Sequence, residues 1–181
     1  LNKNALGIDI MNLSLGHPPL ESAATDPLVA AVEQASAAGI VVVVASGNIG
    51  INPQTGLPGY GGITSPANAP SAITVGAVDT AGTGDLSDDS VAPFSSRGPS
   101  WYDTTAKPDI IAAGVNVVAP VPADAALAVA FPTRDIPTAN GNYMRLTGTS
   151  MAAAVVSGAA AVMLQINRAA FPSNPALTPN T

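Results

Sequence analysis

The residues with the clearest chemical potential are Gly148-Thr149-Ser150-Met151-Ala152, which open a run of small apolar residues that continues to Leu164. They place one hydroxyl at the expected start of a helix, where unpaired N–H groups and the positive end of the helix dipole converge. Such a position suits a nucleophile whose reaction creates an oxyanion. An ordinary core helix with a polar start has the same pattern, so this stretch alone leaves both interpretations open.

Two further segments carry polar groups at the expected ends of strands. Asn48 follows the β-branched run 40–45, which is typical of a buried parallel strand, and ligands gather at the carboxyl ends of such strands. Its amide can donate a hydrogen bond to a developing oxyanion, and the backbone N–H of Ser150 can donate a second. A turn asparagine after a glycine is the plainer interpretation. Ser14-Leu15-Gly16 ends an earlier strand and offers backbone groups with which an extended peptide can pair.

The elements that must position these groups begin with a β-α-β pattern. Residues 8–15 predict a strand that runs into a loop, and the next segment predicts a helix that is capped by Asp26, starts at Pro27 and stops at Gly39. Its expected apolar face contains Leu28, Val32 and Ala35. The strand 40–45 follows directly, so the sheet is predicted to be parallel.

The rest of the chain alternates short apolar runs with long turns. Further strands are expected at 72–78, 110–113 and 115–119, and a buried helix at 151–164. Irregular segments are expected at 50–70, 79–90 and 122–142, and a flexible tail at 170–181. These elements predict a single α/β domain with a mostly parallel sheet.

Composition excludes several classes of protein. The chain has 181 residues, 47% of them hydrophobic and only 10% charged, so it can bury a core. Its net charge is -6 and its six basic residues are scattered, so nucleic acid is not an expected partner. Cysteine is absent, which excludes disulfides and thiolate zinc sites. The apolar run 151–164 is too short to cross a membrane. A membrane is therefore not an expected partner.

Taken together and in order, several segments resemble the subtilisin-like serine peptidases (subtilases, peptidase family S8). The resemblance covers nearly the whole chain. It implies a three-layer α/β/α fold with a mostly parallel sheet whose amino-terminal strands are missing, so that residues 1–181 form the carboxyl-terminal part of one catalytic domain. The segments are Asn12–Gly16, Val44–Asn48, Ser71–Asp79, Phe94–Pro99, Lys107–Ile110 with Ala119-Pro120, and Gly148–Ala152.

The resemblance also implies roles for individual residues. Ser150 is the expected nucleophile and Asn48 the expected oxyanion donor of a serine endopeptidase that works through an acyl-enzyme. The pocket for the residue before the scissile bond is implied to be lined by Ser14, Leu15 and Gly16 on one side and by Ala45, Ser46 and Gly47 on the other. The family further implies a secreted or extracellular protein.

The triad is not complete in this sequence. The family orders its triad Asp, His, Ser, with the first two well upstream of the asparagine segment, and neither motif is present. His17 is the only histidine and is interpreted as a loop residue; Asp9 is interpreted as a structural or solvated carboxylate. Ala154 and Val155 stand where the family usually has proline and often histidine, which permits a more regular helix. Because a serine hydroxyl needs a base, the isolated chain is predicted to be inactive without the upstream Asp and His.

Two other functions match parts of this sequence. The sequence around Ser150 is near the G-x-S-x-G elbow of α/β-hydrolases, but that fold needs an acid and a histidine after the serine, and residues 151–181 contain no Asp, Glu or His. The alternative that stays open is a non-catalytic pseudopeptidase or peptide-binding module, which would use the Ser14 strand without chemistry.

The expected partners are a peptide or protein substrate and the missing amino-terminal part of the same domain. Without that part an apolar edge and face would be exposed, so self-association of the chain is expected. No cofactor is predicted. Calcium is frequent in the family, and Asp85, Asp88 and Asp89 are candidate ligands, although clustered exposed carboxylates are usually only solvated. If Ile49 borders the pocket, an apolar residue before the cleaved bond is favoured.

Overall fold

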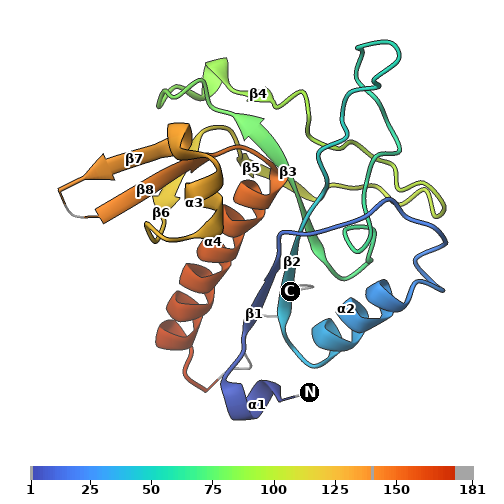
Figure 1. Ribbon diagram of the computed structural model, residues 1–181. Coiled ribbons are helices and arrows are strands. Elements are labelled where there is room, and N and C mark those ends of the chain that lie inside the picture. Colours follow the sequence, from blue (N-terminus) through green and yellow to red (C-terminus); the bar gives the residue numbers. More distant parts are fainter. Residues whose placement is uncertain (1, 140, 174–181) are drawn as a thin grey trace.

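Figure 1 shows the computed structural model, which describes residues 2–139 and 141–173. Helix α2 lies on one side of the central strands and helix α4 on the other. The helices are α1 (Lys3–Leu6), α2 (Pro27–Ala37), α3 (Ala126–Ala130) and α4 (Thr149–Ala170), with the 3₁₀ turns η1 (Leu86–Asp88) and η2 (Pro132–Arg134). The strands are β1 (Ile10–Leu13), β2 (Val41–Ala45), β3 (Ile73–Asp79), β4 (Ser90–Val91), β5 (Ile110–Ala113), β6 (Val117–Pro120), β7 (Asp135–Thr138) and β8 (Gly141–Leu146).

The central sheet is parallel over most of its width. β1 pairs with β2, β2 with β3 and β3 with β5, all in parallel, while the short β4 pairs antiparallel with β3. Every residue of β2 is buried. Alternate residues of β2 face opposite sides, because Val42 and Val44 belong to the core under α2 whereas Val41 and Val43 belong to the core under α4. The predicted three-layer α/β/α arrangement is confirmed.

Helix α2 forms where local signals predict it. Asp26 caps it by accepting hydrogen bonds from the N–H groups of Leu28 (2.8 Å) and Val29 (3.3 Å), and Pro27 occupies the first turn. The predicted apolar face is wrong at one position. Val29, and not Leu28, is buried beside Val32 and Ala35. Neighbouring helix positions point about 100° apart, and the sheet lies under the side that Val29 shares with the residues three and six positions later.

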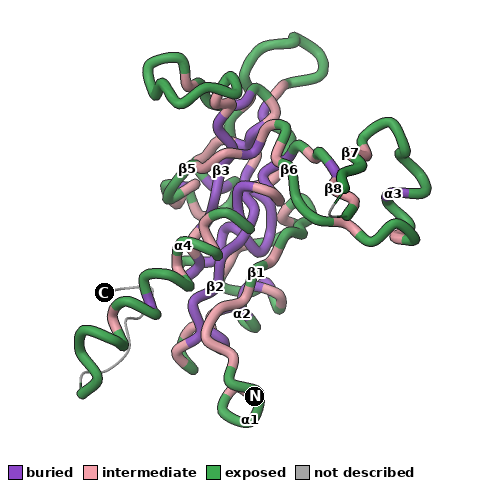
Figure 2. Tube along the Cα trace, turned by 90° about the vertical axis from the view of Figure 1, so that its left-hand side faces the viewer, coloured by how far each residue is buried: buried purple, intermediate pink, exposed green. Residues whose placement is uncertain are grey.

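Helix α4 crosses the opposite face of the sheet and contacts β1, β2, β3 and β5. It is longer than the predicted 151–164 because it continues to Ala170. Only Thr149, Ala152, Ala153 and Leu164 are buried in it, and Figure 2 shows a long exposed stretch toward its carboxyl end. We call Val155, Val162, Met163 and Ile166 the outer face of α4; all four are exposed.

Length and composition alone would allow α4 to cross a membrane, since it has 22 residues and a mean hydropathy of 1.6 in its most apolar window. The core helix of a water-soluble domain passes the same test. Its packing on the sheet already accounts for its inner apolar residues. The expectation that no membrane is a partner therefore stays a prediction.

A second, smaller sheet departs from the predicted organisation. The expected strand 115–119 is β6, but it pairs antiparallel with β8, which in turn pairs with β7, and the three lie outside the parallel sheet. The expected irregular excursion 122–142 contains α3, η2 and β7. β7 pairs antiparallel with β8, the next strand in the chain, so the two form a hairpin. Of the tail expected at 170–181, residues 174–181 lie outside the described residues.

Candidate active site

Ser150 is the second residue of α4 and lies in its first turn. The N–H groups of a first turn have no partner within the helix, and the positive end of the helix dipole points at the same place. A negative charge that develops beside Ser150 is therefore stabilised both by the dipole and by the backbone N–H of Ser150 itself.

Asn48 is oriented by the residue before the serine. Its Oδ1 accepts hydrogen bonds from the backbone N–H of Thr149 (2.9 Å) and from the Thr149 hydroxyl (3.0 Å). Because these bonds occupy the carbonyl end of the amide, the Nδ2 end of Asn48 is directed away from Thr149 and is free to donate. Thr149 is fully buried, and its hydroxyl also accepts a bond from the N–H of Gly47 (3.3 Å).

The role of Thr149 differs from the one its sequence position suggests. A threonine at a helix start is expected to cap, but no side-chain cap hydrogen bond forms at the start of α4. Its hydroxyl instead joins the end of β2 to the start of α4. No local signal reveals this role, because Asn48 lies 101 residues away in the chain.

A chain of hydrogen bonds ties the end of β1 to the same helix. The Ser157 hydroxyl donates to Asn12 Oδ1 (3.1 Å), Asn12 Nδ2 donates to the Ser14 hydroxyl (2.9 Å), and Ser14 donates to the backbone carbonyl of Ser150 (2.9 Å). Asn12 and Ser157 therefore help to position Ser14 and the start of α4, a role that sequence reasoning did not assign to either residue. Their spacing of 145 residues explains why.

Asn48 and Ser150 line one cavity of about 350 Å³, which we call the cleft. Leu15 and Gly16 lie on one wall of it, and within the described residues their backbone groups make no hydrogen bond. An extended peptide can therefore pair with them as an added strand. The residues that line the cleft are Ser14, Leu15, Gly16, His17, Pro18, Ala45, Gly47, Asn48, Ile49, Thr64, Thr149 and Ser150.

The structure brings together all but one of the residues expected to bind substrate. Ala45 and Gly47 line the cleft opposite Leu15 and Gly16, but Ser46 does not. Ser46 is fully buried, and its hydroxyl has no hydrogen-bond partner among the described residues. Side chains alternate along an extended chain, so the side chain of Ser46 points to the other side of the chain from that of Ala45.

Among the described residues, no side-chain base is hydrogen-bonded to the Ser150 hydroxyl. His17 lines the cleft, but its Nδ1 donates to the carbonyl of Pro18 (2.8 Å), and no hydrogen bond joins its ring to the Ser150 hydroxyl. Asp9 makes a two-point ion pair with Arg168, with distances of 2.7 and 2.8 Å. The hydrogen bond from Arg168 lowers the pKa of Asp9, and it keeps this carboxylate in a structural role at the far end of α4.

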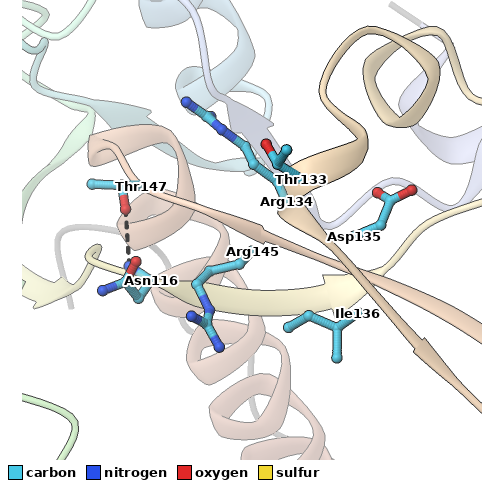
Figure 3. Close-up of a pocket in the computed structure, with 7 residues that line it drawn as sticks. All are labelled: Asn116, Thr133, Arg134, Asp135, Ile136, Arg145 and Thr147. Atoms are coloured by element: carbon cyan, nitrogen blue, oxygen red, sulfur yellow. Dashed lines mark hydrogen bonds between the residues drawn. The ribbon is translucent and has the colours of Figure 1, made fainter.

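A larger cavity of about 500 Å³ lies beside the β7–β8 hairpin and does not include Ser150 or Asn48. Its side chains come from η2, β7, β8, the residue after β8 and the turn before β6, which contributes Asn116 (Figure 3). Arg134 and Arg145 both line it, but Figure 3 shows their guanidinium groups pointing in different directions. No set of polar groups converges there, whereas Asn48 and Ser150 both line the cleft.

The turn-rich segment 79–90 contains the candidate calcium ligands Asp85, Asp88 and Asp89. Across residues 2–139 and 141–173, no group of three His, Cys, Asp or Glu side chains is placed to hold a metal ion. Asp85 accepts a hydrogen bond from the N–H of Ser87, and Asp88 accepts from the hydroxyl of Thr83. The Asp85 and Asp88 carboxylates are therefore engaged within their own segment.

An α/β/α fold that presents a serine at a helix start beside an oriented amide donor defines a site of the serine-peptidase type. The family model of the subtilases, peptidase family S8, matches residues 3–181. The chain belongs to the subtilase family. This assignment excludes the α/β-hydrolase interpretation of the sequence around Ser150.

Individual relatives agree with the assignment. The chain is 42% identical over 175 residues to serine protease AprX of Bacillus subtilis (strain 168), and the match covers 96% of this chain and 36% of AprX. It is 37% identical over 158 residues to subtilisin DY of Bacillus licheniformis, covering 87% of this chain and 43% of the relative. The chain thus spans less than half the length of the curated relatives it matches.

Solved structures give the same result. Sphericase superposes with a TM-score of 0.64 at 27% identity, over 99% of this chain and 48% of that one. A cold-adapted subtilisin-like serine proteinase superposes with a TM-score of 0.56 at 28% identity, over 94% of this chain and 44% of that one.

Proposed function

We propose that this chain carries the nucleophile and the oxyanion donors of a serine endopeptidase, and that a complementary segment outside these 181 residues supplies the base and its carboxylate. The observation that carries the proposal is the pair of hydrogen bonds from Thr149 to Asn48 Oδ1, because they leave the donor end of the amide free at the cleft that Ser150 lines.

In the proposed reaction, an extended peptide pairs with Leu15 and Gly16, and the Ser150 oxygen attacks the carbonyl carbon of its scissile bond. The carbonyl oxygen becomes an oxyanion, which accepts hydrogen bonds from Asn48 Nδ2 and from the backbone N–H of Ser150. The complementary base takes the serine proton and passes it to the departing amine. An acyl-enzyme remains on Ser150 until water releases it.

The surroundings of Ser150 support a docking position for the complementary segment. Ser150 and Ser14 also border a second, apolar cavity of about 380 Å³, which includes Ala154 and Val155 of α4 and is bounded by residues of β6 and β8. The outer face of α4 continues from this cavity along the helix. A segment packed on this continuous apolar surface would bring a base next to the Ser150 hydroxyl and keep water away from it.

The proposal is tested by complementation. The part of Bacillus subtilis AprX that precedes the region matched here is fused to the amino end of this chain, and hydrolysis of a chromogenic peptide is measured. The fusion is expected to be active and the Ser150→Ala fusion inactive. Asn48→Ala is expected to lower kcat by about 10²–10³-fold, the usual loss for one oxyanion donor.

Gln165→Ala is the matched control, because it removes an exposed amide near the carboxyl end of α4 and should leave kcat unchanged. Peptide binding by a correctly folded fusion that never cleaves would instead establish the non-catalytic alternative. A fusion whose activity survives Asn48→Ala would contradict the role proposed for that amide.

The same proposal extends to the setting of the protein. We expect its substrates to be peptides or proteins and its site of action to be extracellular, in line with the secreted enzymes that the subtilase family includes.

A further inference from the structure

We propose that Thr64 closes the pocket for the substrate residue before the scissile bond, so that this pocket accepts small side chains such as alanine and excludes aromatic ones. The inference rests on the proposed function, since it concerns the same cleft. It replaces the broader expectation of an apolar residue at this position with a limit on size.

The two walls of the cleft meet at one side chain. A Cβ atom added at Gly16 would lie 2.6 Å from Thr64 Oγ1, and one added at Gly47 would lie 2.7 Å from Thr64 Cγ2. Thr64 therefore touches the glycine of each wall with a different branch of its side chain. A substrate side chain that enters between the two glycines meets Thr64 at the inner end.

Thr64 is also held in place. Its backbone N–H and its hydroxyl both bond to the carbonyl of Ser46, at 3.1 and 3.3 Å. The next residue, Ser65, exchanges backbone hydrogen bonds with His17 on the opposite wall, at 2.9 and 3.0 Å. Thr64 is 7% exposed and β-branched, so no other rotamer is readily available to it. It cannot swing aside for a larger group.

The outer part of the cleft is less restricted. Leu15 and Ile49 line it and are each 53% exposed. These two side chains form an apolar rim, which suits contact with the small substrate side chain and with its neighbours in the peptide. The selection by size is therefore assigned to the inner end, at Thr64, and not to the rim.

The test measures binding, so that it does not depend on turnover. Two acetylated tetrapeptides with free carboxylates, Ala-Ala-Pro-Ala and Ala-Ala-Pro-Phe, are titrated into the 181-residue chain, and affinities are obtained from the amide NMR shifts of Gly16 and Gly47. The peptide ending in alanine is expected to bind at least tenfold more tightly, because one excess methylene already changes discrimination by about tenfold or more.

Three variants locate the cause. Thr64→Gly and the milder Thr64→Ala should each shift the ratio of affinities toward phenylalanine, by tenfold or more for Thr64→Gly. Thr64→Val keeps the shape and removes the hydroxyl, so it should keep the preference for alanine. Circular dichroism and thermal unfolding establish that each variant is folded.

The outcomes separate the two proposals. Equal affinity for the two peptides in the wild-type chain, or a ratio that neither Thr64→Gly nor Thr64→Ala changes, overturns the role of Thr64 and leaves the proposed function intact. If neither peptide binds the wild-type chain or any variant at millimolar concentration, the proposed function fails and the inference fails with it.

Discussion

Helices α2 and α4 pack on opposite faces of one sheet, yet only α2 has an outward face typical of a finished surface. α2 buries Val29, Val32 and Ala35 and presents small or polar residues outward. α4 buries its inner face in the same way but also exposes Val162, Met163 and Ile166, at 54%, 61% and 62%. Large apolar residues in a row on an exposed helix face are typical of a surface that another segment covers.

The helix with the uncovered face is also the one that carries Ser150. Its first turn is tied to both substrate-side walls, through Thr149 to Asn48 and through Ser14 to the Ser150 carbonyl. The cleft side of the site is therefore assembled within the described residues, whereas no base among these residues is hydrogen-bonded to Ser150. The exposed apolar face and the proposed incompleteness of the site therefore lie on the same helix.

The largest expected effect comes from placing the same charge on each helix. Val32→Asp puts a carboxylate into the core under α2, and unpaired buried charges belong to the most damaging substitutions, so the free energy of unfolding should fall by about 4 kcal/mol or more. Val162 lies on the outer face of α4. Val162→Asp should therefore change the free energy of unfolding by less than about 0.5 kcal/mol. Urea denaturation of dilute protein measures both; similar losses would mean that the two faces do not differ.

The exposed face of α4 should also drive self-association. Val162→Gln combined with Ile166→Gln is expected to weaken association by at least tenfold, which corresponds to about 1.4 kcal/mol. Sedimentation velocity over a range of protein concentrations measures this. Ala31→Gln, on the exposed face of α2, is the control and should have no effect. A wild-type chain that stays monomeric at high concentration would contradict this use of the face.

The start of α2 should make stability depend on pH. Burial raises the pKa of Asp26, but hydrogen bonds donated by Ser65, Leu28 and Val29 outweigh it and hold the pKa below its usual value. A carboxyl group with a lowered pKa stabilises the fold above its unfolded pKa of about 3.9 and loses that contribution as the pH falls through the lower, folded value. The free energy of unfolding should therefore fall below pH ~4.

Asp26→Asn is the matched variant, because asparagine caps helices about as well as aspartate. It should flatten the pH profile of urea denaturation below pH ~4, whereas Asp26→Ala should also cost about 1 kcal/mol near neutral pH through loss of the cap. Asp9 and Asp85 also have lowered pKa values, so a residual slope should remain. A profile identical in Asp26→Asn and wild type would contradict the assignment to Asp26.

The smallest effect is expected at the far end of α4. Arg168 pairs with Asp9 at two points, but both side chains are about half exposed. Solvent and salt screen such pairs. Arg168→Ala should therefore change the denaturation midpoint by an amount near the limit of detection, and less still in high salt. A clear loss of stability would show that this pair anchors α4 to the start of β1.

Local signals predicted much of this fold. Asp26, Pro27 and Gly39 bound α2 in the sequence as they do in the structure, and the run of valines is the buried strand β2. Each of these signals acts over a few residues. The antiparallel pairing of β6 with β8 was not predicted, because the partner of Val117 is Leu146, on the other side of a long insertion.

In the site, too, local motifs predicted some residues, and contacts between distant residues hid others. Ser150, Asn48 and the Ser14 strand were found from motifs, and the structure gathers them around the cleft. Motifs did not reveal that Thr149 orients Asn48. They also did not reveal that Thr64 lies at the end of the cleft. Each acts on a residue brought to it by folding, across 101 residues for Thr149, and neither belongs to a pattern of neighbouring residues.

The central claim is that Ser150 is positioned but has no base within this chain, and its most direct test is labelling by a fluorophosphonate probe. Ser150 in the isolated chain should react no faster than a free serine, whereas Ser150 in the AprX fusion should label stoichiometrically and lose that labelling in Ser150→Ala. Rapid, stoichiometric labelling of Ser150 in the isolated chain would contradict the account.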